Sequence, residues 1–229
     1  MKVLKIPARS SLLLTLAMFS SVSVASAGSW KEIVDDDGIK VWRKKVEGSP
    51  FVAFRGETTV DASIKKVLAV LNDQDKKTSW MHRCVANYAI EYKKLGQVII
   101  YNRTGSNFPL VADRDVVVET KLTYDTDNGV IDIIAVDTTH KNGPLIEGVV
   151  RMKKLRLNWR LTFISKKKTL VRYEVQTDPG GALPAWVVNL VSKGVPQKTL
   201  GALRKQVLLP YEKSLAYVDA SFDWSKVGL

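Results

Sequence analysis

The feature that most constrains the fold is a strict alternation of apolar and polar residues in the second half of the chain. From Leu155 to Phe163 every second residue is apolar, and the residues between them are polar. The pattern recurs from Val171 to Val175, after a lysine-rich turn, and it is already present from Val116 to Tyr124. Successive side chains of a strand point to opposite faces, so each segment predicts a strand with one apolar and one solvated face. Several such strands predict an antiparallel sheet that curves over a core.

The first half of the chain predicts two more strands and a helix. Alternation runs through Ile39–Lys44 and Phe51–Val60, so both are expected to be strands. Trp30–Val34 is interpreted as a short helical segment. Apolar residues then recur three and four positions apart over Ile64–Leu71, which indicates a helix with one buried face, and Asp61 is expected to cap it.

A long helix is predicted at the C-terminal end. The segment Asp178-Pro179-Gly180-Gly181 ends the last strand, and Pro184 suits a first helical turn. The helix is expected to reach about Tyr217, with a kink at Pro196, where its apolar stripe changes face, and with Pro210 as a candidate second break. Many antiparallel strands followed by one long helix predict an α+β fold of helix-grip architecture, in which a curved antiparallel β-sheet wraps around the C-terminal α-helix.

The first 27 residues predict an export signal that is not part of the fold. Lys2, Lys5 and Arg9 form a basic start, an apolar run follows over Leu12–Val24, and Ala25-Ser26-Ala27 matches a signal-peptidase site. The alternative is a retained N-terminal anchor. The sequence therefore favours cleavage after residue 27.

Export changes how the charge of the chain is interpreted. The formal net charge is +12, and removal of the signal peptide lowers it to +9. A basic surface attracts nucleic acid, but the basic residues are scattered over outward strand positions, and we expect export to a periplasm, or secretion, with no nucleic-acid partner. The mature chain is expected to form one domain over 28–219, followed by a tail over 220–229.

Cysteine and histidine usage limits the chemistry. Cys84 is the only cysteine, so no internal disulfide forms. His82 lies two residues away, which places it on another face of the helix expected over Lys76–Cys84, so Cys84 is expected to be a buried structural residue. With His82 and His140 as the only histidines, a multi-histidine metal site is excluded, and we expect no metal and no cofactor.

Four short motifs occur in a fixed order along the chain. They are Pro109-Leu110 with Arg114-Asp115-Val116-Val117-Val118, then Gly148-Val149-Val150-Arg151, then the segment from Asp178 to Asn189, and finally Lys193-Gly194-Val195-Pro196 followed by Leu200 and Leu203. From about Trp30 to Tyr217 their order and spacing resemble the START family of lipid-transfer domains, especially its phosphatidylcholine-transfer branch.

The resemblance implies that the sheet and the helix enclose a hydrophobic tunnel. Residues that face inward on the strands and along the helix stripe would line it. The alternative is that they fill an ordinary core, because a core and a tunnel wall have the same periodicity. The expected lining is Val118, Thr120, Leu122, Tyr124, Leu157, Trp159, Leu161, Tyr173, Val187, Leu190 and Val191.

The resemblance also implies a gate, formed by the loop over 138–146 and the start of the last helix. The apolar residues that follow the glycine and proline of the loop are suited to dip into a bilayer, with Lys141 and Lys193 near anionic headgroups. The alternative is an ordinary polar hairpin loop. The expected gate residues are His140, Gly143, Pro144, Leu145, Ile146 and Trp186.

Two polar features near the expected tunnel have different interpretations. Arg114 and Asp115 are expected to form a structural ion pair that fixes a loop to the sheet, with a polar contact near the tunnel as the alternative. Six positions after Arg114, where the sterol-carrying animal members have a buried basic residue, this chain has Thr120. We expect Thr120 to make a polar contact with the ligand.

The function that the resemblance implies is non-catalytic binding and transfer of one lipid (a phospholipid, a sterol or a fatty acyl lipid) between membranes. We expect a monomer that makes transient contact with an anionic membrane surface, and a lone exported domain favours a bacterial source. One alternative is a cyclase-like helix-grip enzyme acting on polyketide or aromatic compounds, which requires an acid or base facing the cavity. Another is a sensor of small hydrophobic molecules.

Overall fold

The computed structural model describes residues 28–94, 96–106, 108, 111–211 and 224–227. The predicted signal peptide and most of the predicted tail lie outside these residues. The strands are β1 (Lys31–Asp36), β2 (Ile39–Lys45), β3 (Val52–Val60), β4 (Cys84–Lys94), β5 (Gln97–Thr104), β6 (Arg114–Asp125), β7 (Val130–Asp137), β8 (Val150–Arg151), β9 (Lys154–Ser165) and β10 (Lys168–Asp178). The helices are α1 (Ile64–Asn72), α2 (Lys77–Trp80), α3 (Ala185–Ser192), α4 (Val195–Gln206) and the 3-10 turn η1 (Trp224–Val227).

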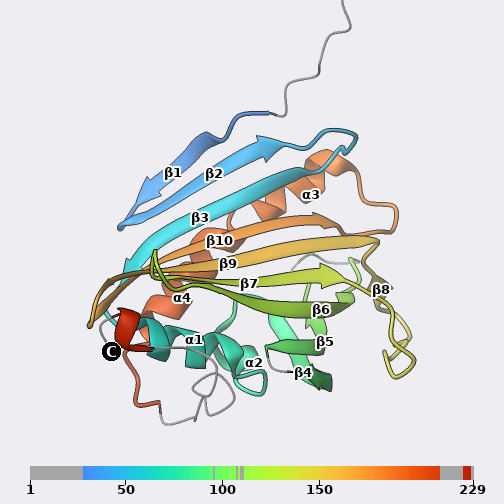
Figure 1. Ribbon diagram of the computed structural model, residues 1–229. Helices are drawn as coiled ribbons and strands as arrows, with labels where there is room; N and C mark the ends of the chain where they lie inside the picture. The colour runs from blue at the N-terminus through green and yellow to red at the C-terminus, as the bar shows by residue number, and fades with distance from the viewer. Residues whose placement is uncertain (1–27, 95, 107, 109–110, 212–223, 228–229) are drawn as a thin grey trace, which may run out of the picture.

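All ten described strands belong to one curved sheet, in the order β1-β2-β3-β10-β9-β7-β6-β5-β4 (Figure 1). Every neighbouring pair along this path is antiparallel, and the two-residue strand β8 pairs in parallel with the start of β6. Helices α3 and α4 lie behind the sheet in the view of Figure 1, and α4 contacts β2, β3 and β10. The predicted α+β helix-grip fold is confirmed.

The main core lies between the sheet and helices α1 and α4. Helix α1 buries Ile64 and Val67 on one face, as their spacing predicted, and α4 buries Leu200. Helix α4 approaches β3 so closely that a Cβ atom at Gly56 would lie 2.7 Å from Leu200 Cδ1 and 2.8 Å from Pro196 Cβ. A glycine in the middle of β3 is therefore what allows the sheet to close on α4.

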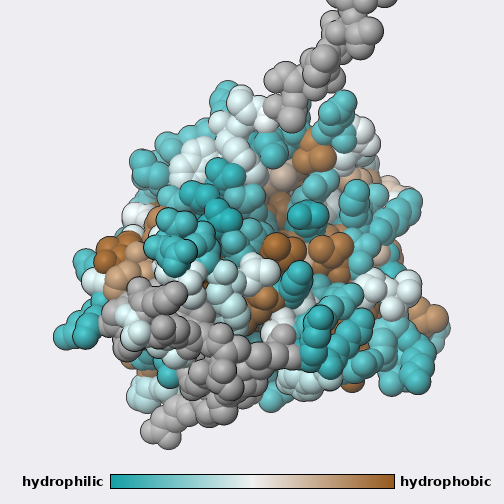
Figure 2. Space-filling view, in the orientation of Figure 1, coloured by the Kyte–Doolittle hydropathy of each residue, from teal (hydrophilic) through white to brown (hydrophobic). Residues whose placement is uncertain are grey.

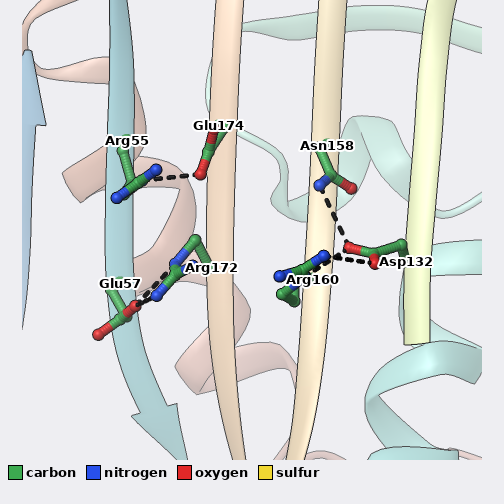
Figure 3. Close-up of polar contacts among 7 residues, drawn as sticks. All are labelled: Arg55, Glu57, Asp132, Asn158, Arg160, Arg172 and Glu174. Atoms are coloured by element: carbon green, nitrogen blue, oxygen red, sulfur yellow. Dashed lines mark hydrogen bonds and ion pairs between the residues drawn. The ribbon is translucent and has the colours of Figure 1, made fainter. Parts of the chain in front are cut away.

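The opposite face of the sheet carries ion pairs between neighbouring strands (Figure 3). These residues are the polar members of the alternating pattern, and the face they occupy is largely hydrophilic in the space-filling view (Figure 2). The cross-strand pairs are Arg55–Glu174, Arg172–Glu57 and Arg160–Asp132, with N···O distances of 2.7, 2.8 and 2.9 Å. Alternation in the sequence thus separates a solvated face from an apolar one.

Three predictions in the first half of the chain were wrong in detail. Residues 31–34 form part of strand β1 instead of a helix, because they pair with β2 in antiparallel register. The side chain that caps α1 is Ser63, whose Oγ accepts a hydrogen bond of 3.2 Å from the Lys66 amide, and Asp61 lies outside the cap. Helix α2 ends at Trp80, so Cys84 begins strand β4 where a helix was expected.

The C-terminal helix is divided into two. Lys193 and Gly194 separate α3 from α4, and Pro196 lies in the first turn of α4, where a missing amide hydrogen costs little. The predicted kink is therefore a break. Helix α4 ends at Gln206, earlier than the predicted Tyr217, and residues 212–223 lie outside the described part. In the described part, no helix is long and apolar enough to cross a membrane.

Candidate functional site: a two-part cavity beneath the C-terminal helices

An apolar cavity of about 330 Å³ lies between α3, the start of α4 and the inner face of the sheet. We call it the outer cavity. Strands β3, β9 and β10 form its floor and helix α3 covers it. The apolar residues that line it are Val52, Phe54, Met81, Phe108, Val111, Met152, Leu155, Leu157, Tyr173, Val175, Leu183, Val187, Val188, Val191 and Val195.

A second cavity of about 100 Å³, the inner cavity, continues between α1, α2 and strands β5, β6, β7 and β9. The two cavities have four lining residues in common: Met81, Asn102, Leu155 and Leu157. The two cavities are therefore adjacent parts of the space between the sheet and the helices, and together they are at the lower end of the size range of ligand sites.

Most of the residues predicted to line a tunnel do line this space. Val118, Thr120, Leu122 and Trp159 line the inner cavity, Tyr173, Val187 and Val191 line the outer cavity, and Leu157 lines both. The hydroxyl of Thr120 donates a hydrogen bond of 3.0 Å to the carbonyl of Val98, so only its oxygen lone pairs are available to a ligand.

Three predicted lining residues lie elsewhere. Leu161 is fully buried and Tyr124 packs against the same core, because both are at the α1 end of their strands, where the core is filled. Leu190 is 65% exposed. On helix α3 the neighbours Val187 and Val191 are turned toward the cavity, which leaves Leu190 on the solvent side.

None of the predicted gate residues lines either cavity. His140 Nε2 lies 2.8 Å from Glu91 Oε2 on β4, and a Cβ atom at Gly143 would lie 2.9 Å from Val117 Cγ2. Val117 is on the face of β6 opposite the cavity residue Val118, so the loop packs on the far side of the sheet. Of the two predicted gate elements, the loop over 138–146 and helix α3, only α3 covers the cavity. Its Trp186 is 70% exposed.

The predicted ion pair between Arg114 and Asp115 is wrong, because consecutive residues of a strand point to opposite faces. Arg114 points to the outer cavity. Asp115, which is 2% exposed, points away and accepts hydrogen bonds of 2.7 and 3.1 Å from Arg151 and of 3.1 Å from the Tyr101 hydroxyl. Burial and the neighbouring Asp115 raise the pKa of Tyr101 to about 12.

Lys77, which the sequence analysis missed, is the most unusual residue of the inner cavity. It is 6% exposed, and in the described part of the chain its ammonium group makes no hydrogen bond or ion pair. The ammonium nitrogen lies 5.1 Å from the centroid of the Trp80 ring. Burial lowers the pKa of Lys77 to about 8. The spacing of three residues to Trp80 was the available signal, since it places both on one helical face.

Two further basic residues of the outer cavity, His82 and Arg83, were also missed. Both lie in the connection between α2 and β4, where no periodicity indicates which side chains turn inward. The described lining of the two cavities includes no aspartate or glutamate. In the same described residues no cluster of three or more histidine, cysteine, aspartate or glutamate side chains is suited to hold a metal ion.

Cys84 is buried, as predicted, and lies beside this site without facing it. Its sulfur accepts a hydrogen bond of 3.3 Å from the Asn102 side chain. Burial raises the pKa of the thiol, which disfavours the reactive thiolate. The observed environment is that of a structural cysteine.

A curved sheet that closes over an apolar cavity, with a C-terminal helical pair as its cover, defines the helix-grip class of ligand-binding domains. The family model described as START domain matches residues 16–206, which is more than half of the chain. The chain belongs to the START domain family.

Individual relatives agree with this assignment. An uncharacterised protein of Pseudomonas aeruginosa is 32% identical over 191 residues, which cover 83% of this chain and 93% of that protein. The phosphatidylcholine transfer protein of Bos taurus is 26% identical over 175 residues, covering 75% of this chain and 81% of that one. A STAR-related lipid transfer protein from Xanthomonas axonopodis has a similar structure, with a TM-score of 0.71, 29% identity, and coverage of 79% of this chain and 99% of that chain.

Proposed function

We propose that this protein binds one lipid in the two-part cavity and transfers it between membranes without catalysing a reaction. The observation that carries the proposal is a pair of adjacent, largely apolar cavities that have Leu155 and Leu157 in common and lie beneath helix α3, whose other face is exposed to solvent. Each Å² of apolar lipid surface that leaves water contributes about 25 cal/mol. An acyl chain is therefore a ligand that this wall stabilises.

Helix α3 is the proposed point of contact with the membrane. One face of α3 lines the cavity through Val187 and Val191, while Trp186 and Leu190 on the other face are 70% and 65% exposed. Apolar side chains on both faces of one surface helix favour a helix that moves between the protein and a bilayer. The exposed Leu145 is proposed to contact the bilayer as part of the loop over 138–146.

The proposal includes export as a monomer. The basic and apolar N-terminal segment supports passage to a periplasm or secretion, and the positive net charge favours anionic membrane surfaces over neutral ones.

A cyclase would need an acid or base at the cavity wall. Burial lowers the pKa of Lys77 at this wall to about 8. Burial, followed by the charges of Lys198 and Arg83, lowers the pKa of His82. No acidic partner in the described lining orients it for proton transfer.

The decisive experiment is mass spectrometry of organic extracts from protein purified without detergent. We expect one lipid class to co-purify in near-equimolar amount. The same protein, after delipidation, is expected to take up fluorescent acyl lipids from vesicles and to release them to acceptor vesicles. Delipidated, folded protein that binds no phospholipid, sterol or fatty acid would disprove lipid transfer.

A further inference from the structure

The outer cavity carries its positive charge on one side of a largely apolar wall. Arg83 and Arg114 both line it, and His82 lies next to Arg83. Arg83 immediately precedes β4 and Arg114 begins β6, and the two ends are connected through β5: the Gly105 amide donates a hydrogen bond of 2.8 Å to the carbonyl of Arg83. Guanidinium groups stay protonated at any physiological pH, so this side of the cavity is permanently cationic.

The acidic residue beside Arg114 is already engaged. Asp113 forms an ion pair of 2.6 Å with Arg103, and it also accepts a hydrogen bond of 2.8 Å from the Ser106 amide. The described lining of the outer cavity contributes no other carboxylate. Burial, and then the positive charge of Arg83, lower the pKa of Arg114, and the negative charge of Asp113 offsets only part of this effect. An anion in the cavity would relieve this repulsion.

Hydrogen-bond donors on both arginines remain available. Arg114 Nε is buried without an acceptor among the described residues, and its Nη1 donates to the Ala112 carbonyl, which leaves Nη2 as the donor without a partner among the described residues. Arg83 uses Nε to donate a hydrogen bond of 2.8 Å to the Gly105 carbonyl, which leaves its two terminal nitrogens. A ligand that supplies acceptors to these terminal nitrogens therefore gains charge-assisted hydrogen bonds.

The backbone at Arg83 is also in an unusual conformation. Its φ angle is 62°, in the left-handed region that residues with a side chain rarely adopt. Two hydrogen bonds with Gly105, one from the backbone and one from the side chain, hold it there. This conformation turns the chain between α2 and β4 so that the guanidinium group reaches the cavity, and such strain is typical of binding sites.

We propose that Arg83 and Arg114 bind the anionic group of the carried lipid, a phosphate or a carboxylate, while its acyl chain lies along the apolar wall toward Leu157. The inference rests on the proposed function and adds the ligand class: a lipid with a negative charge next to its acyl chain. Oxygens of such a group accept charge-assisted hydrogen bonds from both guanidinium groups, which are stronger than bonds between neutral groups. Lys77, in the inner cavity, is the alternative partner for the anionic group. If Lys77 caused a preference for charged lipids, Lys77→Met would remove that preference and the arginine substitutions would not.

The test compares two pairs of fluorescently labelled lipids with identical chains, titrated into the delipidated full-length protein. Phosphatidic acid and diacylglycerol differ only in the phosphate, and a fatty acid and its methyl ester differ only in the carboxylate. We expect at least one charged lipid to bind about tenfold or more tightly than its neutral partner. A phosphate-only preference indicates a phospholipid, and a carboxylate-only preference indicates a fatty acid.

Arg83→Gln and Arg114→Gln are each expected to reduce that preference by about tenfold and to leave the affinity for the neutral lipid unchanged. Arg156→Gln, which removes an exposed arginine from the other face of β9, is the matched control and is expected to change neither affinity. Thermal unfolding of each variant establishes that it is folded, and Arg83→Gln keeps the test usable if loss of the Ala112 contact unfolds Arg114→Gln.

Equal affinity of the wild-type protein for charged and neutral lipids would overturn the inference while leaving lipid transfer intact. A charge preference that survives both arginine substitutions but disappears in Lys77→Met would also overturn it, because the anionic group would then lie in the inner cavity. If no lipid of either pair binds to folded protein, the inference fails, and titration with the remaining phospholipids and with sterols decides whether lipid transfer fails with it.

Discussion

At the scale of single residues, Lys77 is where charge and burial conflict most strongly. Its ammonium group is buried and forms no ion pair in the described part of the chain, and the charge of Asp73 offsets only part of the cost of burial. The pKa near 8, against an ordinary value of 10.5, corresponds to a cost of about 3 kcal/mol when the group is charged. The buried Lys77 ammonium group therefore lowers the free energy of unfolding of the protein.

We expect Lys77→Met to raise the free energy of unfolding by about 3 kcal/mol below pH 8. The unfolded chain binds more protons than the folded one between pH 8 and 10.5, so the wild-type protein regains stability as pH rises through this window, and the difference between the two proteins shrinks. Urea unfolding at several pH values measures it. Lys76→Met, at an exposed neighbour, is the control, and a constant difference across the window would contradict the prediction.

The buried carboxylate of Asp115 belongs to the same scale. Asp115 accepts two hydrogen bonds from Arg151, with N···O distances of 2.7 and 3.1 Å. These bonds connect strand β8, which contains Arg151, to strand β6. Because removal of one partner leaves the other poorly solvated, Asp115→Ala is expected to cost about 3 kcal/mol. A double-mutant cycle with Arg151→Ala, followed by urea unfolding, should give a coupling energy above about 1 kcal/mol.

The Arg160–Asp132 pair on the solvated face is the matched control for that cycle. Arg160 is more exposed than Arg151, so its pair is screened by water and is expected to give a coupling energy below about 1 kcal/mol. Equal couplings for the two pairs would show that burial does not strengthen the Asp115 interaction.

At the scale of elements, the contact between β3 and α4 fixes how tightly the sheet closes. A methyl group at Gly56 would lie within 2.8 Å of atoms of both Leu200 and Pro196. We therefore expect Gly56→Ala to destabilise the protein by about 1–3 kcal/mol, because either the helix or the strand must shift. Urea unfolding with far-ultraviolet circular dichroism measures the loss.

Gly201, in the middle of α4, provides the control for the Gly56→Ala substitution. A Cβ atom there would meet Ile39 Cδ1 at 3.7 Å, an ordinary van der Waals distance. Gly201→Ala is expected to stabilise the protein by about 0.5–1 kcal/mol, because alanine favours helix over glycine. A stabilising Gly56→Ala would mean that α4 is free to move away from β3.

Helix α3 is the other element whose properties can be tested by substitution. Leu190→Asp places a charge on the exposed face proposed to enter the bilayer. Transfer between anionic vesicles is expected to slow about tenfold, while binding of lipid added from solution stays unchanged, because the cavity face of α3 is intact. Leu208→Asp, at an exposed apolar residue after α4, is the control. Loss of vesicle transfer in both variants alike would argue against α3 as the contact.

At the scale of the whole molecule, the proposed function requires the lipid to extend from the outer cavity into the inner one. Leu157 lines both, so its replacement by tryptophan fills the junction. Leu157→Trp is expected to abolish lipid uptake and to leave the fold intact, since the larger side chain extends into empty space. Fluorescent-lipid titration and thermal unfolding test this together. Ile164→Trp, at an exposed position of the same strand, should bind as the wild-type protein does.

The sequence by itself determined the fold class, because period-two alternation and three-to-four spacing depend only on which face of an element is buried. It also identified which side of each strand turns inward, and Val118, Leu122 and Leu157 are on that side. Local pattern carries this information without any knowledge of the partner element.

Only the tertiary structure decided where the buried face of an element packs against another element and where it lines a cavity. Leu161 and Leu157 alternate on one strand, yet the first packs beneath α1 and the second lines a cavity. Lys77 reaches the cavity from a four-residue helix, where its spacing to Trp80 is the one available signal, and Arg83 reaches it from a connection without periodicity. Periodicity reports burial along one element, whereas a cavity and its charges arise from the distance between elements, which no single segment encodes.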